Sequence, residues 1–234
     1  MDMRVNIHLL HIGYCKEIIY FYNKLLNIET NIHGDIFVNL SRIEYCDYLD
    51  KKTDSVSIDD CQLEIYIDKN FTKVEQELLS IKSEIRDKKD GVYITTKDPS
   101  GLNVKLNFID KNIIPKILIP YKGSSDTIEE FYNNLGLTIK DKSIILKNNP
   151  IEYYCKKEKL SMILTQGFEL WIVSEDKAID VKNKIEEYGG KVIFDDDGMY
   201  GRIITAKDPA GVTIVILPSD ESQGFIFDGK IIGA

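Results

Sequence analysis

The chain has 234 residues, 43% hydrophobic and 29% charged, a balance that excludes a disordered chain and favours globular domains. No apolar run reaches the roughly 18 residues of a membrane span, and no signal-peptide pattern opens the chain, so we expect a cytoplasmic protein without membrane contact. The 30 lysines and arginines are outnumbered by 38 aspartates and glutamates, and this net charge of −8 argues against a nucleic-acid partner.

The first part of the chain predicts one βαβββ unit. Residues 4–12 alternate apolar and polar side chains, as a strand with one buried face does. Residues 14–26 carry apolar side chains at helical spacing. Two short strand patterns follow at residues 36–40 and 42–48, and then a polar loop at residues 50–60.

The pattern then restarts as a second unit. Residues 61–67 read as a strand, residues 71–85 as a helix, and residues 92–96 and 102–108 as two further strands. The last two strands are joined by Asp-Pro-Ser-Gly at residues 98–101. This segment predicts a tight turn, because proline fixes φ and glycine tolerates the closing conformation.

Two motifs recur 110 residues later. The segment GVYITTKDPSG at 91–101 returns as GRIITAKDPAG at 201–211, with seven of eleven positions identical. FYNKL at 21–25 returns as FYNNL at 131–135. The second half is therefore a copy of the first, with strands predicted at 116–120, 143–146, 151–155, 168–173, 203–206 and 212–217 and helices at 126–135 and 176–188. We predict one domain at residues 1–110, another at 111–218, and a tail at 219–234 that packs as an added strand or lies loose.

These motifs, in this order, resemble the vicinal oxygen chelate superfamily, the group of glyoxalase I, bleomycin-resistance proteins and extradiol dioxygenases. The resemblance covers about residues 4–218. It implies an α+β fold of two tandem modules, in which two βαβββ units form a curved mixed sheet. Each sheet is then a cup that holds a ligand on its concave side.

The resemblance also implies where an enzyme of the family would hold its metal. The corresponding positions here are Asn6, Gln62, Lys105, Lys116, Glu169 and Val215. A catalytic divalent site needs about three nitrogen or oxygen ligands, and only one of these side chains is a carboxylate. None of the three histidines falls at a matched position, so we predict no metal and no cofactor.

The same strand phases place polar and aromatic side chains on the concave faces. The candidate ligand-binding residues are Asn6, His8, Gln62, Glu64, Tyr66, Lys105, Tyr153, Glu169, Trp171 and Arg202. Such a lining suits a wet pocket, and it equally suits the solvent face of an open sheet. Trp171 is either a ligand wall or a core residue, and Arg202 either holds an anionic group or lies on the surface.

We predict metal-independent binding of a small organic molecule, by resemblance a sequestration of the bleomycin-resistance kind. The acidic charge favours a cationic or aromatic ligand. Two alternatives stay open. One is a metal-independent isomerase or lyase with His8, Glu64 or Glu169 as general base, and the other is a protein-interaction module with degenerate cups. A monomer and a homodimer both fit the sequence.

Overall fold

A computed structural model describes residues 4–12, 15–47, 58–121, 124–140, 143–156, 168–198, 201–218, 225–227 and 230–232. The elements of the first half are β1 (Arg4–Ile12), α1 (Cys15–Ile19), the π-helix η1 (Tyr20–Leu25), β2 (Ile36–Asp47), the 3-10 helix η2 (Ile58–Asp60), β3 (Gln62–Tyr66), α2 (Phe71–Ser80), β4 (Ile85–Lys89), β5 (Tyr93–Lys97) and β6 (Asn103–Asn107). Those of the second half are β7 (Lys116–Tyr121), α3 (Ser125–Asn134), β8 (Ile139–Lys140), β9 (Ser143–Lys156), β10 (Phe168–Ser174), α4 (Ala178–Glu187), β11 (Lys191–Gly198), β12 (Gly201–Lys207) and β13 (Thr213–Pro218). Two short strands end the chain, β14 (Phe225–Phe227) and β15 (Lys230–Ile232).

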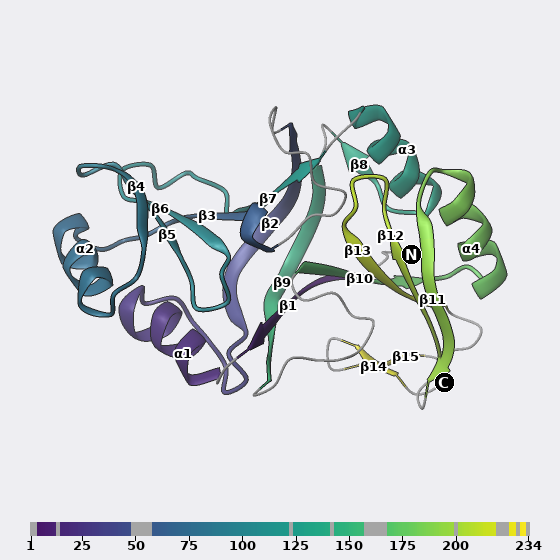
Figure 1. Cartoon of the computed structure of the whole chain (residues 1–234), viewed down its shortest axis with the longest axis horizontal. Coiled ribbons are helices and arrows are strands. Elements are labelled where there is room, and N and C mark those ends of the chain that lie inside the picture. The colour runs from purple at the N-terminus through teal and green to yellow at the C-terminus, as the bar shows by residue number, and fades with distance from the viewer. Residues whose placement is uncertain are drawn as a thin grey trace.

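Most strands join one mixed sheet that runs through both lobes of the molecule (Figure 1). Its order is β11-β12-β13-β10-β1-β9-β2-β7-β3-β6-β5-β4, and β8 pairs with β9 beside this path. Helices α1 and α2 accompany the β3 to β6 lobe, and α3 and α4 accompany the β10 to β13 lobe (Figure 1). The α+β fold predicted from the sequence is therefore confirmed. Strands β14 and β15 pair with each other as a separate sheet.

The two halves of the chain exchange strand partners at the centre of the sheet. The first strand of each half pairs antiparallel with a strand of the other half: β1 with β10, and β7 with β3. On its other side β1 lies parallel to β9, and β7 lies parallel to β2. Side chains on β1 therefore share a surface with those on β10. From the chain order we had expected them to share a surface with those on β3.

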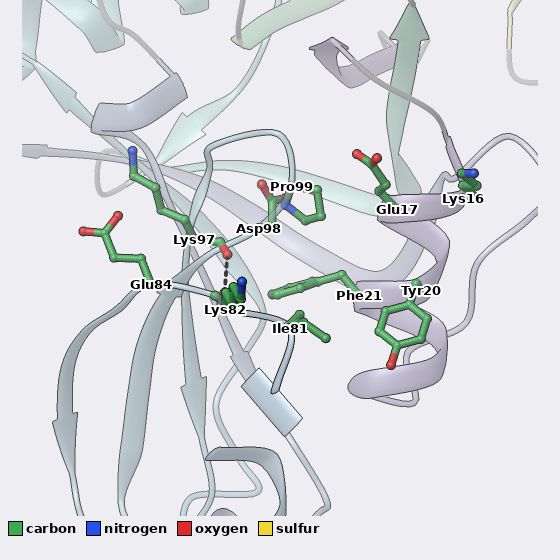
Figure 2. Close-up of a pocket in the computed structure, with 11 residues that line it drawn as sticks. Lys16, Glu17, Tyr20, Phe21, Ile81, Lys82, Glu84, Lys97, Asp98 and Pro99 are labelled. Atoms are coloured by element: carbon green, nitrogen blue, oxygen red, sulfur yellow. Dashed lines mark hydrogen bonds between the residues drawn. The ribbon is translucent and has the colours of Figure 1, made fainter. Parts of the chain in front are cut away.

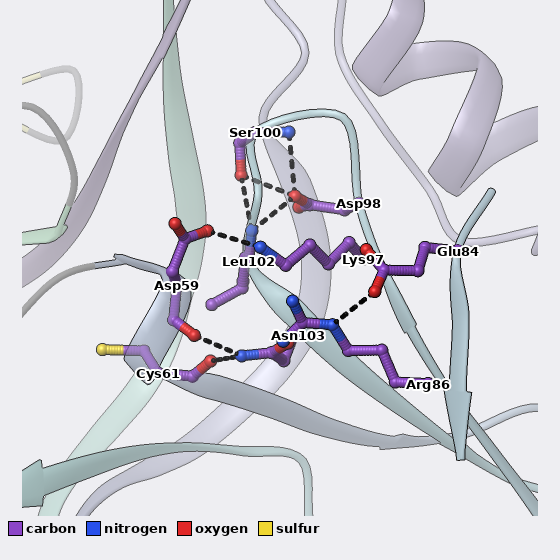
Figure 3. A network of polar contacts seen from close by, with 9 residues as sticks. All are labelled: Asp59, Cys61, Glu84, Arg86, Lys97, Asp98, Ser100, Leu102 and Asn103. Carbon is purple, nitrogen blue, oxygen red and sulfur yellow. Dashed lines mark hydrogen bonds and ion pairs between the residues drawn. The ribbon is translucent and has the colours of Figure 1, made fainter. Parts of the chain in front are cut away.

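The two repeated motifs contact each other in both halves. The Tyr22 hydroxyl donates to Asp98 Oδ2 at 2.7 Å, and the Tyr132 hydroxyl donates to Asp208 Oδ2 at 2.7 Å. The second carboxylate oxygen of each aspartate accepts two backbone N–H groups of its own turn, those of Ser100 and Leu102 in one half and of Ala210 and Val212 in the other. Figure 3 shows this arrangement around Asp98. Each F-Y helix is thus attached to the K-D-P-x-G turn of its own half.

Four of the predictions differ from the structure, and in one of them the strands predicted at 143–146 and 151–155 are a single strand, β9. Helix α2 ends at Ser80, and the charged segment that follows forms β4 instead of a last helical turn. The strands predicted at 36–40 and 42–48 are one strand, β2, whose register with β9 shifts near Leu40. The acidic run at residues 195–198, whose composition is typical of a solvated loop, lies in β11. Both β4 and β11 are the outermost strands of the sheet. Charged side chains on such strands can stay in contact with solvent, so their sequences do not need to alternate with buried residues.

No helix in the described parts of the chain is long and apolar enough to cross a membrane.

Candidate functional site

Three of the predicted site residues form one cluster at the junction of β1 and β10. The rings of His8 and Trp171 stack with their centroids 4.5 Å apart and an interplanar angle of 16°. Glu169 lies opposite His8 in the β1–β10 register, and its Oε2 accepts a hydrogen bond of 3.0 Å from Trp171 Nε1. We call His8, Glu169 and Trp171 the His–Glu–Trp cluster.

Strand alternation explains why these side chains point to the same face. Ile7 and Leu9 flank His8 in β1, and both are fully buried on the opposite face. In β10, Leu170 separates Glu169 from Trp171 and is buried on that same opposite face. His8 and Glu169 are themselves buried, at 3% and 1% exposure, whereas Trp171 is half-buried. Trp171 is therefore the more accessible member of the cluster.

The row that begins with His8 and Glu169 continues across two further strands. Thr213 of β13 lies beside Glu169, and Lys207 of β12 lies beside Thr213. Lys207 Nζ donates to Thr213 Oγ1 at 2.7 Å. Neither residue was among the site candidates predicted from the sequence. Lys207 could have been one, because it belongs to the repeated K-D-P-x-G motif.

Burial changes the proton affinities of the two charged groups in this row. Burial raises the pKa of the Glu169 carboxyl. The Trp171 hydrogen bond and the nearby charges of His8 and Lys207 lower this pKa, but by less than burial raises it. Burial lowers the pKa of Lys207, against the attraction of Asp208 and Glu169. Glu169 Oε1 has no hydrogen-bond partner among the described residues. The site thus holds a carboxyl group that keeps its proton to a higher pH than an exposed glutamate.

The raised pKa of Glu169 predicts a pH-dependent stability. A folded-state pKa above the unfolded value of 4.5 stabilises the fold below pH 4.5, and this contribution is lost as the pH rises through the folded-state pKa. Glu169→Gln, which keeps an acceptor for Trp171, should therefore flatten the pH profile above pH 4.5. Each tenfold change in acid dissociation constant is worth about 1.4 kcal/mol. The measurement is Tm between pH 4.5 and 8 for both proteins, and parallel profiles would contradict the assignment.

The register corrects the predicted alignment of the metal-ligand positions. His8, and not Asn6, lies opposite Glu169, while Asn6 lies opposite Trp171. The cluster thus offers two donor residues, and Lys207 places a positive charge near them. No group of three His, Cys, Asp or Glu side chains that could share a metal occurs among the described residues. The described side chains of the cluster thus supply fewer than the about three protein ligands that a divalent ion needs.

A second group of predicted residues gathers on the other lobe, around Glu64 of β3. Glu64 Oε1 lies 3.0 Å from Lys105 Nζ, and Glu64 Oε2 lies 3.8 Å from Lys116 Nζ. Gln62 and Tyr66 flank Glu64 on the same half-exposed face of β3. Strands β9, β2 and β7 separate this group from the His–Glu–Trp cluster. His8 and Glu64, which we had expected in the same cup of the first half, thus lie in two different places, because β1 pairs with β10.

Three candidates remain. Arg202 lies outside both groups, and the side chains of Asn6 and Tyr153 are outside the described part of the structure. Arg202 binds Asp195 through two hydrogen bonds, Nε to Oδ1 at 2.5 Å and Nη2 to Oδ2 at 2.8 Å. This pairing, with Lys182 added, holds the pKa of Asp195 well below its usual range. Asn6 in β1 and Tyr153 in β9 have described backbones, but their side chains lie outside the described part of the structure.

Comparison with known proteins gives a structural likeness only. No protein-family model and no curated protein sequence matches the chain. Glyoxalase I from Zea mays is structurally similar, with a TM-score of 0.51 at 14% sequence identity over 92% of this chain and 93% of that one. A putative dioxygenase from Bacillus subtilis aligns at a TM-score of 0.41 and 14% identity, over 90% of this chain and 84% of that one. The strand and helix order and the likeness to glyoxalase I together show that the chain has the vicinal oxygen chelate fold.

Proposed function

We propose that the protein binds and sequesters a small planar organic molecule at the His–Glu–Trp cluster, in the cytoplasm and without a metal. The observation that carries this proposal is the stacked His8–Trp171 pair beside a buried carboxyl group. Stacked aromatic side chains favour flat ligands, and a partly exposed indole supplies the face. The Glu169 oxygen that has no partner among the described residues suits a ligand donor or cation. The sequestration part of the proposal rests on the resemblance to bleomycin-resistance proteins.

A second function, metal-independent proton transfer, is favoured by the charges at the same site. A buried carboxyl group with a raised pKa, between an imidazole and an amine, is typical of general acid–base catalysis. The reaction class would be an isomerisation or an elimination, with Glu169 or His8 moving the proton. The two functions share one binding site and differ in whether a product forms.

A thermal-shift screen with cationic, neutral and anionic ring compounds tests binding. A ligand at 100 times its Kd adds about 2.7 kcal/mol of stability, or about 5–10 °C in Tm for a chain of this size. We expect such shifts with flat cationic compounds in the wild type, and their loss in Trp171→Leu and Glu169→Gln. Tyr93→Leu, which removes a half-buried aromatic residue from the other lobe, is the matched control and should keep them. Equal shifts in all four proteins would contradict the proposed site.

Two further measurements separate the functions and test the metal-free premise. Incubating each stabilising compound with protein and analysing it by mass spectrometry or NMR reveals turnover. Product that survives a chelator and disappears in His8→Ala supports proton transfer, and an unchanged compound supports sequestration. Stoichiometric metal in the purified protein would overturn both.

A further inference from the structure

A pocket of about 690 Å³ lies on the helix side of the first lobe, away from the His–Glu–Trp cluster. It is lined by α1 and η1, by the turn after α2, and by the K-D-P-x-G turn. Figure 2 shows Phe21 projecting from the helix towards Ile81 and Lys82 in the turn after α2. Ligand sites usually measure about 300–1,000 Å³, so the volume suits a small molecule.

The pocket interior is mainly apolar. Tyr20, Phe21, Ile81 and Pro99 supply aromatic and aliphatic walls. Tyr20 and Ile81 are among the few large apolar side chains that remain exposed, at 51% and 38%. Large exposed apolar groups that meet in a concave surface are typical of binding sites rather than of ordinary surface.

The corresponding turn of the second half, after α4, is tightly packed. Helices α2 and α4 have equal lengths, so Lys82 and Ser83 correspond to Gly189 and Gly190. A Cβ atom on Gly190 would lie 2.7 Å from Phe131 Cε2 and 2.9 Å from Lys207 O. The glycine turn therefore packs directly against the phenylalanine that corresponds to Phe21.

The residues that differ between the halves explain why the first site is open. Ser83 has a side chain where Gly190 has none, and its Oγ bonds Thr96 Oγ1 at 2.8 Å and Lys97 O at 3.1 Å. The helix beneath it also changes, because residues 20–25 form the π-helix η1 whereas α3 is a regular α-helix. Such π-helical turns occur frequently at functional sites.

Lys82 gives the pocket a positive group. Of the other charged residues that line the pocket, Lys97 binds Asp59 at 2.8 Å, Glu84 faces Arg86 Nε at 3.4 Å, and Asp98 is held by its turn (Figure 3). Lys16 and Glu17 of α1 add one charge of each sign to the lining. Lys82 itself has φ of +57°, a left-handed conformation that Gly189 adopts in the other half. A lysine in this conformation is strained, and such strain is retained mainly at functional sites.

We propose that this pocket is a second ligand site, specific for a small fused-ring or aromatic molecule that carries one acidic group. The rings contact Tyr20, Ile81 and Pro99, and the acidic group contacts the Lys82 ammonium. We assign the site to the first half, since the corresponding turn of the second half lies against Phe131, Ile185 and the backbone oxygen of Lys207.

Fluorescence titration with anilinonaphthalene sulfonate, an anionic ring compound, tests the site directly. We expect saturable binding to the wild type, and at least a tenfold loss of affinity in Ile81→Asp. Ile179→Asp, at an isoleucine of α4 that is 57% exposed, is the matched control and should bind as the wild type does. Equal affinity in Ile81→Asp and wild type would overturn the proposal. So would loss of the signal in Trp171→Leu alone, because the probe would then occupy the His–Glu–Trp cluster.

Lys82→Gly tests the acidic group separately from folding. This variant should raise the Tm by about 2–4 °C, because it relieves the left-handed strain. It should also weaken anilinonaphthalene sulfonate binding several-fold and leave unchanged the binding of phenylnaphthylamine, which lacks the sulfonate. An equal effect on both probes would overturn the assignment of an acidic group to Lys82.

Discussion

Asp208→Ala is expected to lower the free energy of unfolding by about 3 kcal/mol or more, because the change removes the acceptor of three donors, two of them buried and one partly buried. The carboxylate is 3% exposed and accepts from the Tyr132 hydroxyl at 2.7 Å and from the backbone N–H groups of Ala210 and Val212 at 2.9 and 2.8 Å. An unsatisfied buried donor costs about 1–3 kcal/mol, so the three together outweigh any local relaxation. For a chain of this size the Tm should fall by about 6–12 °C.

Two companion variants separate the contributions of the helix and the turn. Tyr132→Phe removes one hydrogen bond and should cost about 1–2 kcal/mol, while Asp208→Asn keeps an acceptor and should cost less than Asp208→Ala. Asp98→Ala in the first half repeats the test at the equivalent contact with Tyr22. Denaturant unfolding of the four variants measures these values. A cost below about 0.5 kcal/mol for Asp208→Ala, as at an ordinary surface site, would show that the contact does not join helix and turn.

Gly190→Ala is expected to destabilise the second half by about 1–3 kcal/mol through overpacking. The added Cβ would lie 2.7 Å from Phe131 Cε2, 2.9 Å from Ile185 Cγ2 and 2.9 Å from the backbone oxygen of Lys207. The oxygen belongs to a strand that is paired on both sides, so it cannot move without disturbing β12. The Tm should fall by about 2–12 °C.

A double-mutant cycle with Phe131→Leu checks that this cost comes from contact with the ring. Shortening Phe131 removes the closest neighbour, so the two changes should be non-additive and the double variant more stable than the sum of the single effects predicts. Additive costs would mean that Ile185 and the oxygen of Lys207, and not the Phe131 ring, oppose the methyl group. A Gly190→Ala protein as stable as the wild type would contradict the close packing of this turn.

The two halves share the tyrosine–aspartate contact and differ in the turn after their second helix. The tyrosine–aspartate contact is the same in both, which explains why F-Y-x-x-L and K-D-P-x-G recur together. The turn after the second helix differs, closed by Gly190 in one half and open beside Ser83 in the other. Duplication of the scaffold therefore left one region in which the halves could acquire different surfaces.

Much of the secondary structure could be predicted because its causes are local. The alternation of residues 4–12 predicted β1, and the proline and glycine of K-D-P-x-G predicted the hairpin turns. The pattern failed at β4 and β11, where charged residues carry no alternation because an outer strand buries little on either face. It also continued α2 beyond Ser80, since Ile81 and Ile85 keep a helical spacing that the left-handed Lys82 interrupts.

The sequence by itself determined the fold class, the duplication and the individual candidates His8, Glu169 and Trp171, because periodicity, repeated motifs and residue chemistry are properties of the chain. Only the tertiary structure decided which candidates meet. Pairing of β1 with β10 brings His8 onto Glu169 and Trp171, and it leaves Glu64 and Lys105 on the far side of β9, β2 and β7. The pocket beside Lys82 likewise depends on how closely a turn approaches a helix. Strand partners and approach distances are set by contacts between segments far apart in sequence, and no local pattern records them.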